Sequence, residues 1–298
     1  MGRILIATPV LGGCLDPLSA HVVVEGEPGS DAEADALICA PMQRVDSAVL
    51  RRMPRLRLIS VAGAGADAVD REEAMSRGVE LVTSGEALVE TTADAAFGLI
   101  ISASRLMHDA EASLRDGSWR GWRFLPDELG RDVHGATLGL VGFGSIGRAV
   151  ARRAAGFGMT VLHHTRRPTQ QPGWVGDLDE LLAASDILSI HVPLDESTRG
   201  LIDRRRIGLL KPTAVLVNTA RGAVLDERAL AEALHEGRLF AAGLDVYEHE
   251  PSVSPPLLAA PRTVLLPHVG SATLSTREAM LRAAAEKVAE RLGRRAAI

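Results

Sequence analysis

Residues 138–147 read Leu-Gly-Leu-Val-Gly-Phe-Gly-Ser-Ile-Gly, a short apolar run that leads into three glycines at G-x-G-x-x-G spacing. This spacing is typical of the turn from a β-strand into a helix at a dinucleotide site. Gly142 would allow the tight bend, Gly144 would let the backbone approach a pyrophosphate, and Gly147 would let the helix pack closely. The free N–H groups of the helix would then face the phosphates. Glycine-rich turns are common, so the rest of the sequence must decide the interpretation.

Short β-like runs alternate with helical stretches along the whole chain. The predicted strands are 4–7, 37–39, 56–61, 80–82, 138–141, 161–163, 187–191 and 215–218. The predicted helices include 177–184, 227–235 and 276–292. This alternation predicts an α/β fold built on parallel sheets.

One stretch, 116–134, breaks the alternation and contains Trp119, Trp122 and Pro126. We expect it to be a loop between two structural units. The mostly apolar stretch 92–114 before it predicts one long helix that carries the chain from one lobe to the other. The boundary is therefore expected near Asp94.

The composition limits the possible functions. The chain has 298 residues, enough for two lobes, and a formal net charge of -5. This charge gives no sign of the basic face that nucleic acid or an anionic membrane would require. Two isolated cysteines, Cys14 and Cys39, form no disulfide or metal framework and fit a reducing cytoplasm. No signal peptide or uncharged membrane-length run is found, so a cytoplasmic protein with small-molecule or protein partners is expected.

A second glycine stretch competes with the first. Residues 58–68 also place G-x-G-x-x-A after a strand, at Gly63, Gly65 and Ala68, and spacing alone does not separate the two turns. Only the 138–147 turn is followed by a strand that ends in Arg166 and Arg167. Two arginines fit a 2′-phosphate, whereas NAD enzymes usually place an acidic residue there.

Four further stretches occur in a fixed order after the glycine turn. They are His191-Val-Pro-Leu194, Asn218-Thr-Ala-Arg-Gly222, Ala242-Gly-Leu-Asp-Val-Tyr-Glu-His-Glu-Pro251 and Pro267-His-Val-Gly-Ser271. With these motifs the chain resembles the D-isomer-specific 2-hydroxyacid dehydrogenases over nearly its whole length. Thr165-Arg-Arg167 and Gly270-Ser-Ala-Thr273 are closest to the glyoxylate/hydroxypyruvate reductases of that family.

The resemblance implies an α/β fold with two lobes. A Rossmann-type doubly wound parallel sheet would form the cofactor domain, 94–269. A smaller flavodoxin-like α/β substrate domain would combine 1–93 with 270–298. The cleft between them would hold the chemistry, and its closure would position the reactants and exclude water. A homodimer formed through the cofactor domain is also implied.

The resemblance also implies a catalytic set. Arg221 would hold the carboxylate of a 2-oxo acid and polarise its carbonyl, because its planar guanidinium presents several donors. His268 would protonate the carbonyl oxygen. Glu250 would orient His268 and favour its charged form, so that reduction runs better at the more acidic side. The 58–68 turn would become the substrate loop, with the N–H groups of Ala64 and Gly65 offered to the substrate carboxylate.

The remaining implied contacts are with the cofactor. They fall on Thr92, Gly142, Gly144, Ser145, Ile146, Gly147, Thr165, Arg166, Arg167, Val192, Pro193, Thr198, Thr219, Ala220, Asp245, His268 and Gly270. Thr165 stands where NAD-preferring members carry an acidic residue, so NADP(H) is expected to be preferred, with NAD(H) possible. The alternative is that Arg166 and Arg167 form only a solvated strand end.

Other residues are expected to have no chemical role. His163 and His164 lack partners at metal spacing, and no metal site is predicted. Arg204-Arg-Arg206 is interpreted as a solvated basic run on a surface helix. Trp119 and Trp122 could line the cleft or a dimer contact, and packing is the simplest expectation for them. Two alternatives for the function stay open: a bulkier 2-oxo acid as substrate, or a dinucleotide-sensing binding protein of the corepressor class.

Overall fold

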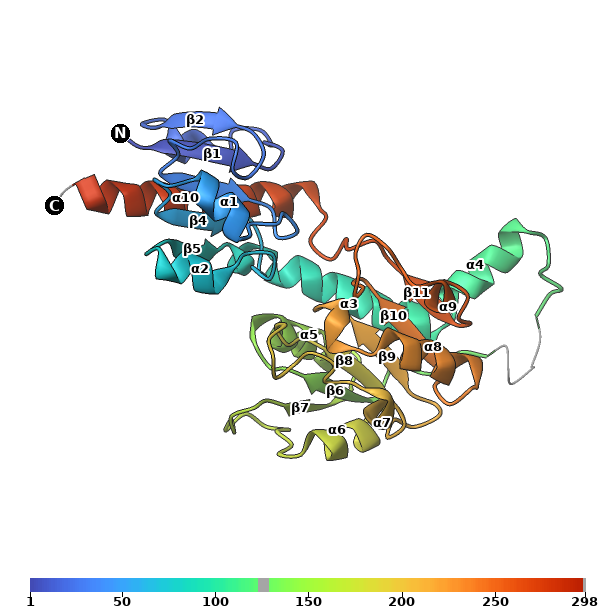
Figure 1. The fold of residues 1–298 in the computed structure, drawn as a ribbon. Helices are drawn as coiled ribbons and strands as arrows, with labels where there is room; N and C mark the ends of the chain where they lie inside the picture. Colours follow the sequence, from blue (N-terminus) through green and yellow to red (C-terminus); the bar gives the residue numbers. More distant parts are fainter. Residues whose placement is uncertain (123–128, 297–298) are drawn as a thin grey trace. The chain divides into compact units, whose positions relative to one another are not determined.

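The computed structural model describes residues 1–122 and 129–296. The chain divides into two compact units, which are considered separately (Figure 1). The first unit combines Met1–Val89 with Ser271–Ile298, and the second is Glu90–Gly270. The chain therefore leaves the first unit once and returns to it for its last helix. The borders expected from the sequence were 93–94 and 269–270.

Within the described residues, the first unit contains one sheet of five parallel strands. Across the sheet these are β2 (Val22–Glu25), β1 (Arg3–Ala7), β3 (Ala36–Cys39), β4 (Leu58–Val61) and β5 (Glu80–Thr83). The order 2-1-3-4-5 is that of flavodoxin-like folds. The flavodoxin-like α/β domain expected from the sequence is confirmed.

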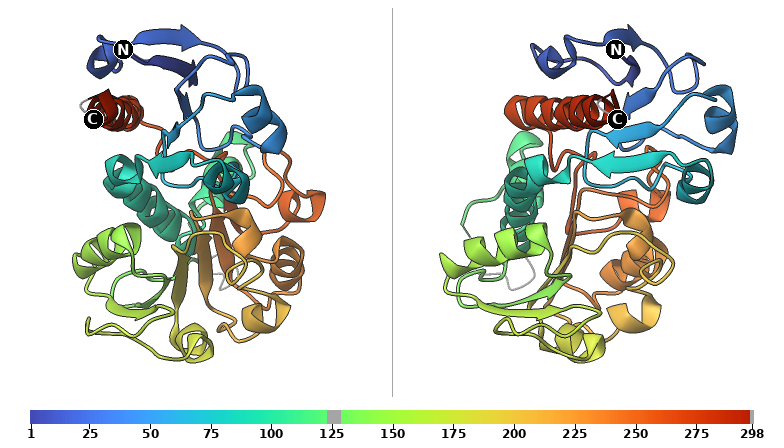
Figure 2. Two further views of the ribbon diagram at one scale, coloured as in Figure 1. Left: turned by 60° about the vertical axis from the view of Figure 1, so that its left-hand side comes forward. Right: turned by 90° about the vertical axis from the view of Figure 1, so that its left-hand side faces the viewer.

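Helices cover both faces of this sheet. They are α1 (Ser47–Arg52), α2 (Arg71–Ser76) and the C-terminal α10 (Leu274–Ala296), with the short 3₁₀ turns η1 (Asp16–Leu18) and η2 (Gly85–Leu88). Alternate strand residues point to opposite faces. Leu5 and Ile59 therefore pack on the α1 and α2 side, while Ile4 and Leu58 pack against Leu281 and its neighbours on α10 (Figure 2).

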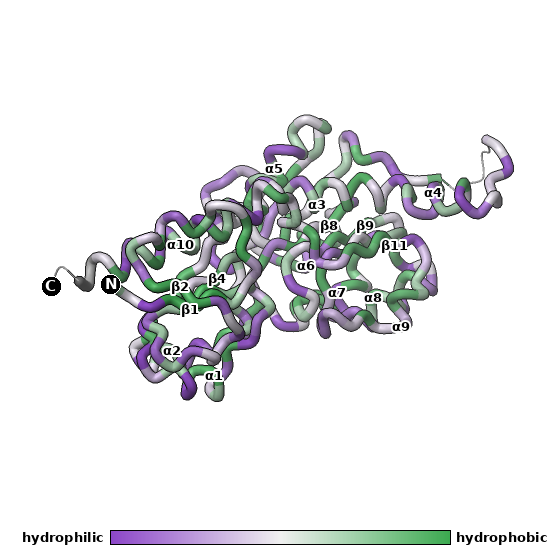
Figure 3. Tube along the Cα trace, turned by 90° about the horizontal axis from the view of Figure 1, so that it is seen from above, coloured by the Kyte–Doolittle hydropathy of each residue, from purple (hydrophilic) through white to green (hydrophobic). Residues whose placement is uncertain are grey.

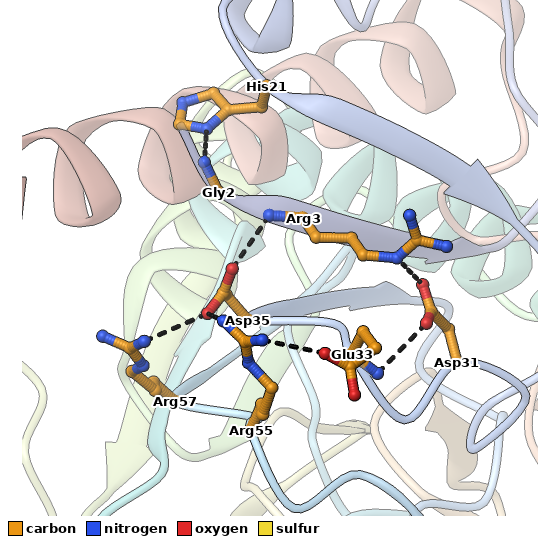
Figure 4. A network of polar contacts seen from close by, with 8 residues as sticks. All are labelled: Gly2, Arg3, His21, Asp31, Glu33, Asp35, Arg55 and Arg57. Carbon is orange, nitrogen blue, oxygen red and sulfur yellow. Dashed lines mark hydrogen bonds and ion pairs between the residues drawn. The ribbon is translucent and has the colours of Figure 1, made fainter.

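A polar network ties together the amino ends of the strands of this unit (Figure 4). Arg3 Nε donates to Asp31 at 2.7 Å, and the Arg3 N–H donates to Asp35 at 2.9 Å. Arg57 donates to the other oxygen of Asp35 at 3.1 Å. Both carboxylates are nearly buried, so their partners offset the cost of removing them from water. The opposite, carboxyl ends of the strands are left for the loops that carry Ala64 and Gly65.

The second unit is built on a parallel sheet of six strands within the described residues. In order these are β11 (Thr263–Leu265), β10 (Ala241–Leu244), β9 (Val215–Asn218), β8 (Ile187–Ile190), β6 (Thr137–Val141) and β7 (Thr160–His164). From β6 the chain first moves outward to β7 and then returns to β8 on the other side. This reversal makes the crevice at the carboxyl ends of β6 and β8 the expected ligand site of a doubly wound sheet.

Helices again cover both faces of this sheet. They are α3 (Val89–Ser104), α5 (Ser145–Ala155), α6 (Leu178–Ala184), α7 (Arg204–Ile207), α8 (Glu227–His235) and α9 (Pro255–Leu258), with the 3₁₀ turn η4 (Gly222–Val224). A further helix, α4 (Met107–Arg115), does not lie on the sheet. The core on the α6, α7 and α8 side includes Leu182, Leu216 and Leu230. On the other face Gly243 lets Leu99 of α3 pack against β10. Strands β8 and β9 lie among the mostly hydrophobic segments of this unit in Figure 3.

The single helix predicted over 92–114 is wrong. Helix α3 ends at Ser104, and α4 begins at Met107 after Leu106 adopts a left-handed φ of 50°. This left-handed conformation is costly for a residue that has a β-carbon, and it interrupts the helical hydrogen bonds. Helix α4 then stands off the rest of its unit (Figures 1 and 3). Within Met107–Arg115, all of it described, no side chain is buried.

The two tryptophans after α4 do not pack into the core, which was one of the placements expected for them. Trp119 is 61% exposed and Trp122 is 83% exposed. Both follow α4, which ends at Arg115 and buries no side chain of its own. The last part of the predicted loop, including Pro126 at 123–128, lies outside the described residues.

The sequence suggested that the basic run at 204–206 is solvated, but in the structure all three arginines form ion pairs. Arg205 and Arg206 both bind Asp179 of α6, at 2.6 Å and 3.0 Å, and Arg204 pairs with Glu232 of α8. Arg205 and Arg206 lower the pKa of Asp179 to about 2. The run therefore connects three helices of the same face.

Residues 85–104, which comprise η2 and α3, are long and apolar enough by length and composition to cross a membrane. Half of this stretch is buried inside the structure, which is the pattern of a core helix. Its acidic residues are paired: Glu86 with Lys287, and both Glu90 and Asp94 with Arg153.

Candidate active site

The glycine turn lies at the carboxyl end of β6, and each of its glycines has a separate structural reason. Gly142 has a φ of +96°, and a β-carbon there would lie 2.6 Å from the carbonyl oxygen of His191. A β-carbon on Gly147 would overlap the carbonyl oxygen of Gly142. A β-carbon on Gly144 would meet nothing within 4 Å. Gly142 and Gly147 are thus needed for packing, while Gly144 faces open space.

This open space is where a dinucleotide would fit. Helix α5 begins at Ser145 directly after Gly144, so the first N–H groups of the helix point out of the turn without helical partners. Such a helix start favours an anion. The residues present therefore fit the pyrophosphate of a nicotinamide dinucleotide, which Gly144, Ser145 and Ile146 would hold.

The end of β7 carries the three residues expected at the adenosine ribose. Thr165 Oγ1 donates to the carbonyl oxygen of Arg167 at 2.7 Å, which closes a tight turn. The guanidinium of Arg166 contacts Asp195 at 3.3 Å and Ser197 Oγ at 3.0 Å. The side chain of Arg167 is exposed. Both arginines are thus available at this strand end.

The two histidines of β7 have structural roles. His163 is fully buried and stacks on Phe143 of the glycine turn, with ring centroids 3.8 Å apart. The Nδ1 atom of His164 lies 3.0 Å from the carbonyl oxygen of Val175. Among the described residues no group of His, Cys, Asp or Glu is arranged to hold a metal ion. His163 is thus a packing residue, as the sequence suggested, and its partner Phe143 makes it a support of the glycine turn.

The loop after β8 brings together Val192, Pro193 and Thr198. Thr198 Oγ1 donates to the carbonyl oxygen of Pro193 at 2.7 Å and accepts from the Asp195 N–H at 2.8 Å. The hydroxyl of Thr198 therefore binds the backbone of its own loop and keeps that backbone in one conformation.

A buried asparagine at the end of β9 shapes the loop that carries Arg221. Asn218 accepts a hydrogen bond from the Ala220 N–H at 3.0 Å and donates to the carbonyl oxygen of Arg221 at 2.9 Å. The next residue must be glycine, because a β-carbon on Gly222 would overlap the backbone of Tyr247. Among the described residues, the buried hydroxyl of Thr219 has no hydrogen-bond partner, so a polar group of a ligand would satisfy it.

Asp245, at the end of β10, holds the segment that presents His268. Its two carboxylate oxygens each accept at 2.7 Å, one from the N–H of Val269 and the other from the N–H of Gly270. Burial raises the pKa of Asp245, although these two N–H groups oppose the shift. His268 itself has a left-handed φ of 54°. Asp245 stabilises this unusual conformation, which a β-carbon disfavours.

His268 and Glu250 form a close pair. The Nδ1–H of His268 donates to Glu250 Oε2 at 2.7 Å, and Glu250 Oε1 accepts from the Tyr247 N–H at 2.9 Å. Burial raises the pKa of Glu250, but the hydrogen bonds from His268 and Tyr247 and the charges of His268 and Arg221 bring it below its usual value. Glu250 is therefore an ionised acceptor. Nδ1 of His268 carries its hydrogen towards Glu250, and Nε2 is left to exchange a proton.

A second buried carboxylate supports the loop that carries Glu250. Glu227, at the start of α8, accepts from the Glu248 N–H at 2.5 Å. Burial raises the pKa of Glu227, and the neighbouring carboxylates of Glu248 and Glu250 add to the shift. Sequence reasoning missed both Glu227 and Asn218. Two signals were available: Asn218 ends β9 and opens the motif Asn218-Thr-Ala-Arg-Gly222, and Glu227 directly follows Asp226, the residue that caps α8.

The expected substrate loop lies in the first unit, at the carboxyl end of β4. Gly63 packs against Pro41, and Gly85 approaches Ala64 so closely that a β-carbon would lie 2.8 Å from the Ala64 Cα. Ala64 itself is exposed, and Gly65 is half-buried. The small residues of this loop are therefore required by its packing as well as by the substrate role expected of it.

The second unit alone brings together most of the predicted set. Arg221 is near enough to Glu250 for its charge to lower the Glu250 pKa, and Glu250 binds His268. Thr92 and Asp245 both adjoin Gly270, where a β-carbon would lie 3.6 Å from Thr92 Cγ2 and 2.8 Å from Asp245 Oδ2. Ala64 and Gly65 are the two predicted residues that lie in the first unit.

Comparison with known proteins identifies the family of this chain. A family model described as the NAD-binding domain of D-isomer-specific 2-hydroxyacid dehydrogenases matches residues 97–270, more than half of the chain. A glyoxylate reductase of Thermococcus litoralis is 42% identical over 269 residues, which cover 87% of this chain and 80% of that protein. A glyoxylate/hydroxypyruvate reductase B of Klebsiella pneumoniae is 40% identical over 268 residues, which cover 88% and 82%.

Solved structures give the same result. The crystal structure of an NADPH-dependent glyoxylate/hydroxypyruvate reductase from Sinorhizobium meliloti, in complex with NADP and malonate, is similar with a TM-score of 0.86. The two chains are 34% identical, and the match covers 96% of this chain and 92% of that one. With a doubly wound sheet, a dinucleotide turn and a histidine–carboxylate pair in one unit, this chain belongs to the D-isomer-specific 2-hydroxyacid dehydrogenase family.

Proposed function

We propose that this enzyme reduces a small 2-oxo acid of the glyoxylate or hydroxypyruvate type to the D-2-hydroxy acid, with NADPH as the preferred reductant. The observation that carries this proposal is the His268–Glu250 pair at 2.7 Å, within the electrostatic reach of Arg221. A proton donor beside a guanidinium suits a substrate that has both a carbonyl to protonate and a carboxylate to bind. The names of the similar reductases support the substrate class.

Arg221 binds and orients the substrate in this proposal. A planar guanidinium can donate to the carboxylate of a 2-oxo acid and to its carbonyl oxygen at once. Asn218 holds the backbone on either side of Arg221, which keeps the fork in one place before the substrate arrives. The N–H groups of Ala64 and Gly65, in the first unit, would be further donors to the substrate carboxylate.

His268 moves the proton. When bound, the nicotinamide supplies the hydride that reduces the carbonyl carbon. Nε2 of His268 gives its proton to the carbonyl oxygen in reduction and takes it back in oxidation. Glu250 keeps Nδ1 protonated and stabilises the imidazolium, while Asp245 fixes the backbone from which His268 projects.

The substrate class is tested by initial rates of cofactor oxidation at 340 nm. Glyoxylate, hydroxypyruvate, pyruvate and a bulky aryl 2-oxo acid are each measured with NADPH and with NADH. Fast turnover of the two small acids with NADPH is the expected result. Faster turnover of the aryl acid would show that the substrate is a bulkier 2-oxo acid. Tight NADPH binding without turnover of any acid would favour the dinucleotide-sensing class.

Glu250→Gln is expected to move the pH dependence of reduction towards acid. Glu250 is ionised over the working range because its pKa lies below the usual value. Its negative charge favours protonated His268, the form that donates. Glutamine removes that charge, so reduction should slow first at the alkaline side and the alkaline limb of kcat/KM should move towards lower pH.

The control for this shift is Glu248→Gln, which removes an exposed charge from the same loop. Rates are measured between pH 5 and pH 9 in the direction of reduction. An unchanged alkaline limb in Glu250→Gln would show that Glu250 does not act through the protonation of His268.

We also propose that the preference for NADPH comes from the end of β7. Arg166 and Arg167 present two cations there, and Thr165 adds no negative charge that would repel a 2′-phosphate. Arg167→Asp should therefore raise the Kd for NADPH relative to that for NADH. An unchanged ratio would mean that Arg167 is only a solvated strand end.

A homodimer through α4 and the segment after it is a further part of the proposal. Met107, Leu114, Trp119 and Trp122 are all largely exposed, and a second copy that covers them would form a closed two-fold pair. Light scattering should show a dimer at micromolar concentration. The double variant Trp119→Ala/Trp122→Ala should weaken it, whereas Met75→Ala, at another exposed apolar residue, should not. A wild-type monomer would refute the proposal.

The cysteines support a reducing, cytoplasmic setting for this enzyme. Cys14 and Cys39 are both free and buried. Burial raises the pKa of Cys39 to about 12, so it remains an unreactive thiol. Neither residue takes part in the proposed chemistry.

A further inference from the structure

The contact between Arg166 and Asp195 crosses the ligand crevice of the second unit. Arg166 follows β7 and Asp195 follows β8, and β6 with its glycine turn lies between these two strands in the sheet. The Arg166 guanidinium nevertheless reaches Asp195 Oδ2 at 3.3 Å and Ser197 Oγ at 3.0 Å. Its side chain therefore extends across the carboxyl end of β6.

Asp195 is held firmly in the position where it meets Arg166. Its other oxygen, Oδ1, accepts from the Ser197 N–H at 2.9 Å and from the Ser197 hydroxyl at 2.6 Å. The Asp195 N–H donates to Thr198 Oγ1, which in turn donates to the carbonyl oxygen of Pro193. The carboxylate is thus part of the loop structure, whereas the Arg166 side chain is 71% exposed and free to change partner.

We propose that Asp195 is a specificity-determining residue, because it competes with the 2′-phosphate of NADPH for Arg166. This inference rests on the proposed use of Arg166 as a phosphate ligand. A 2′-phosphate at the end of β7 can bind Arg166 fully only if the guanidinium leaves Asp195 or is shared with it. NADH has no such phosphate and leaves the pair intact. Asp195 therefore lowers the affinity for NADPH and leaves that for NADH unchanged.

The size of the effect follows from the exposure of the pair. Asp195 is 38% exposed and Arg166 is 71% exposed, so water screens their attraction. Exposed ion pairs contribute little free energy. Removing Asp195 as a competitor should therefore change the affinity for NADPH by about twofold to fivefold. The NADPH affinity of the wild type is reduced by that factor.

Asp195→Asn tests this directly. Asparagine keeps an oxygen that can accept from Ser197, but it loses the charge and the acceptor that face Arg166. Calorimetric titration of the full-length enzyme with NADPH and with NADH, without substrate, should show a Kd for NADPH lower by about twofold to fivefold. The Kd for NADH should not change. Glu196→Gln removes an exposed charge from the neighbouring position and should leave both values unchanged.

A double-mutant cycle shows whether the effect passes through Arg166. Asp195→Asn should have no effect on NADPH binding in an Arg166→Ala background. Tightening that persists there, tightening by Glu196→Gln as well, or unchanged or weaker NADPH binding in Asp195→Asn would each overturn the inference.

The cycle also separates this inference from the proposal beneath it. If Arg166→Ala weakens NADPH binding but Asp195→Asn does not strengthen it, Arg166 binds the phosphate without competition and only the role of Asp195 is wrong. If Arg166→Ala leaves NADPH binding unchanged, Arg166 is not a phosphate ligand and both statements are wrong. Turnover of 2-oxo acids does not enter either result.

Discussion

His268→Ala is expected to lower kcat for 2-oxo acid reduction by about 10²-fold to 10⁴-fold, which is the usual contribution of a positioned general acid. The imidazole is 32% exposed and Glu250 is 13% exposed, so His268 can reach a substrate while its partner stays buried. Alanine removes the proton donor and leaves the glycine turn and the end of β7 unchanged. NADPH should therefore bind with nearly the wild-type Kd.

The matched control is His249→Ala. His249 is exposed and lies in the same loop as Glu250, so its removal tests whether any histidine of this region is needed. Steady-state rates and NADPH titration are measured for both variants. If His268→Ala retains more than a tenth of the wild-type kcat, another group is the proton donor.

Arg221→Lys is expected to lower kcat/KM by about 10²-fold, comparable with the loss of one donor that stabilises developing negative charge. Lysine keeps the positive charge but presents an ammonium in place of a planar fork. Asn218 fixes the backbone position from which the arginine side chain extends. From the same position, lysine cannot form two parallel hydrogen bonds to a carboxylate.

The pH profile distinguishes this variant from the others. The positive charge that helps to lower the Glu250 pKa remains in Arg221→Lys, so the alkaline limb should stay in place while the rate falls. Arg228→Lys, at a highly exposed arginine, is the matched control and should behave as wild type. A limb that moves in Arg221→Lys would show that Arg221 acts mainly through the charge state of the His268–Glu250 pair.

Much of the fold was predictable because it depends on local sequence. The strands 138–141 and 215–218 were predicted as short apolar runs, and a continuous apolar run is the pattern of a strand buried on both faces. Three strands were missed, although β2 contains the apolar run Val22-Val-Val24. Strand β10 reads Ala-Ala-Gly-Leu, β11 has three residues, and β2 is a largely exposed edge strand. They are strands because a neighbour supplies their hydrogen bonds, which no local propensity encodes.

The predicted helix over 92–114 fails for a related reason. Apolar spacing continues through the break, and nothing in the sequence Ser104-Arg-Leu-Met107 is a helix breaker. The left-handed φ of Leu106 is imposed by tertiary contacts: Leu106 is nearly buried, and the carbonyl oxygen of Ser104 accepts from the distant Arg131 N–H at 2.6 Å. Packing thus overrides propensity here.

The sequence by itself determined the parallel α/β class, the glycine turn and the residue types of the site, because periodicity, glycine spacing and motif order are properties of the chain. Only the tertiary structure decided how these residues act on one another. The His268–Glu250 pair, the positions that Glu227 and Asp245 support, and the Arg166–Asp195 contact all join segments that follow different strands. Parallel strands place their carboxyl ends at one edge of the sheet, and their order in the sheet selects which side chains meet there.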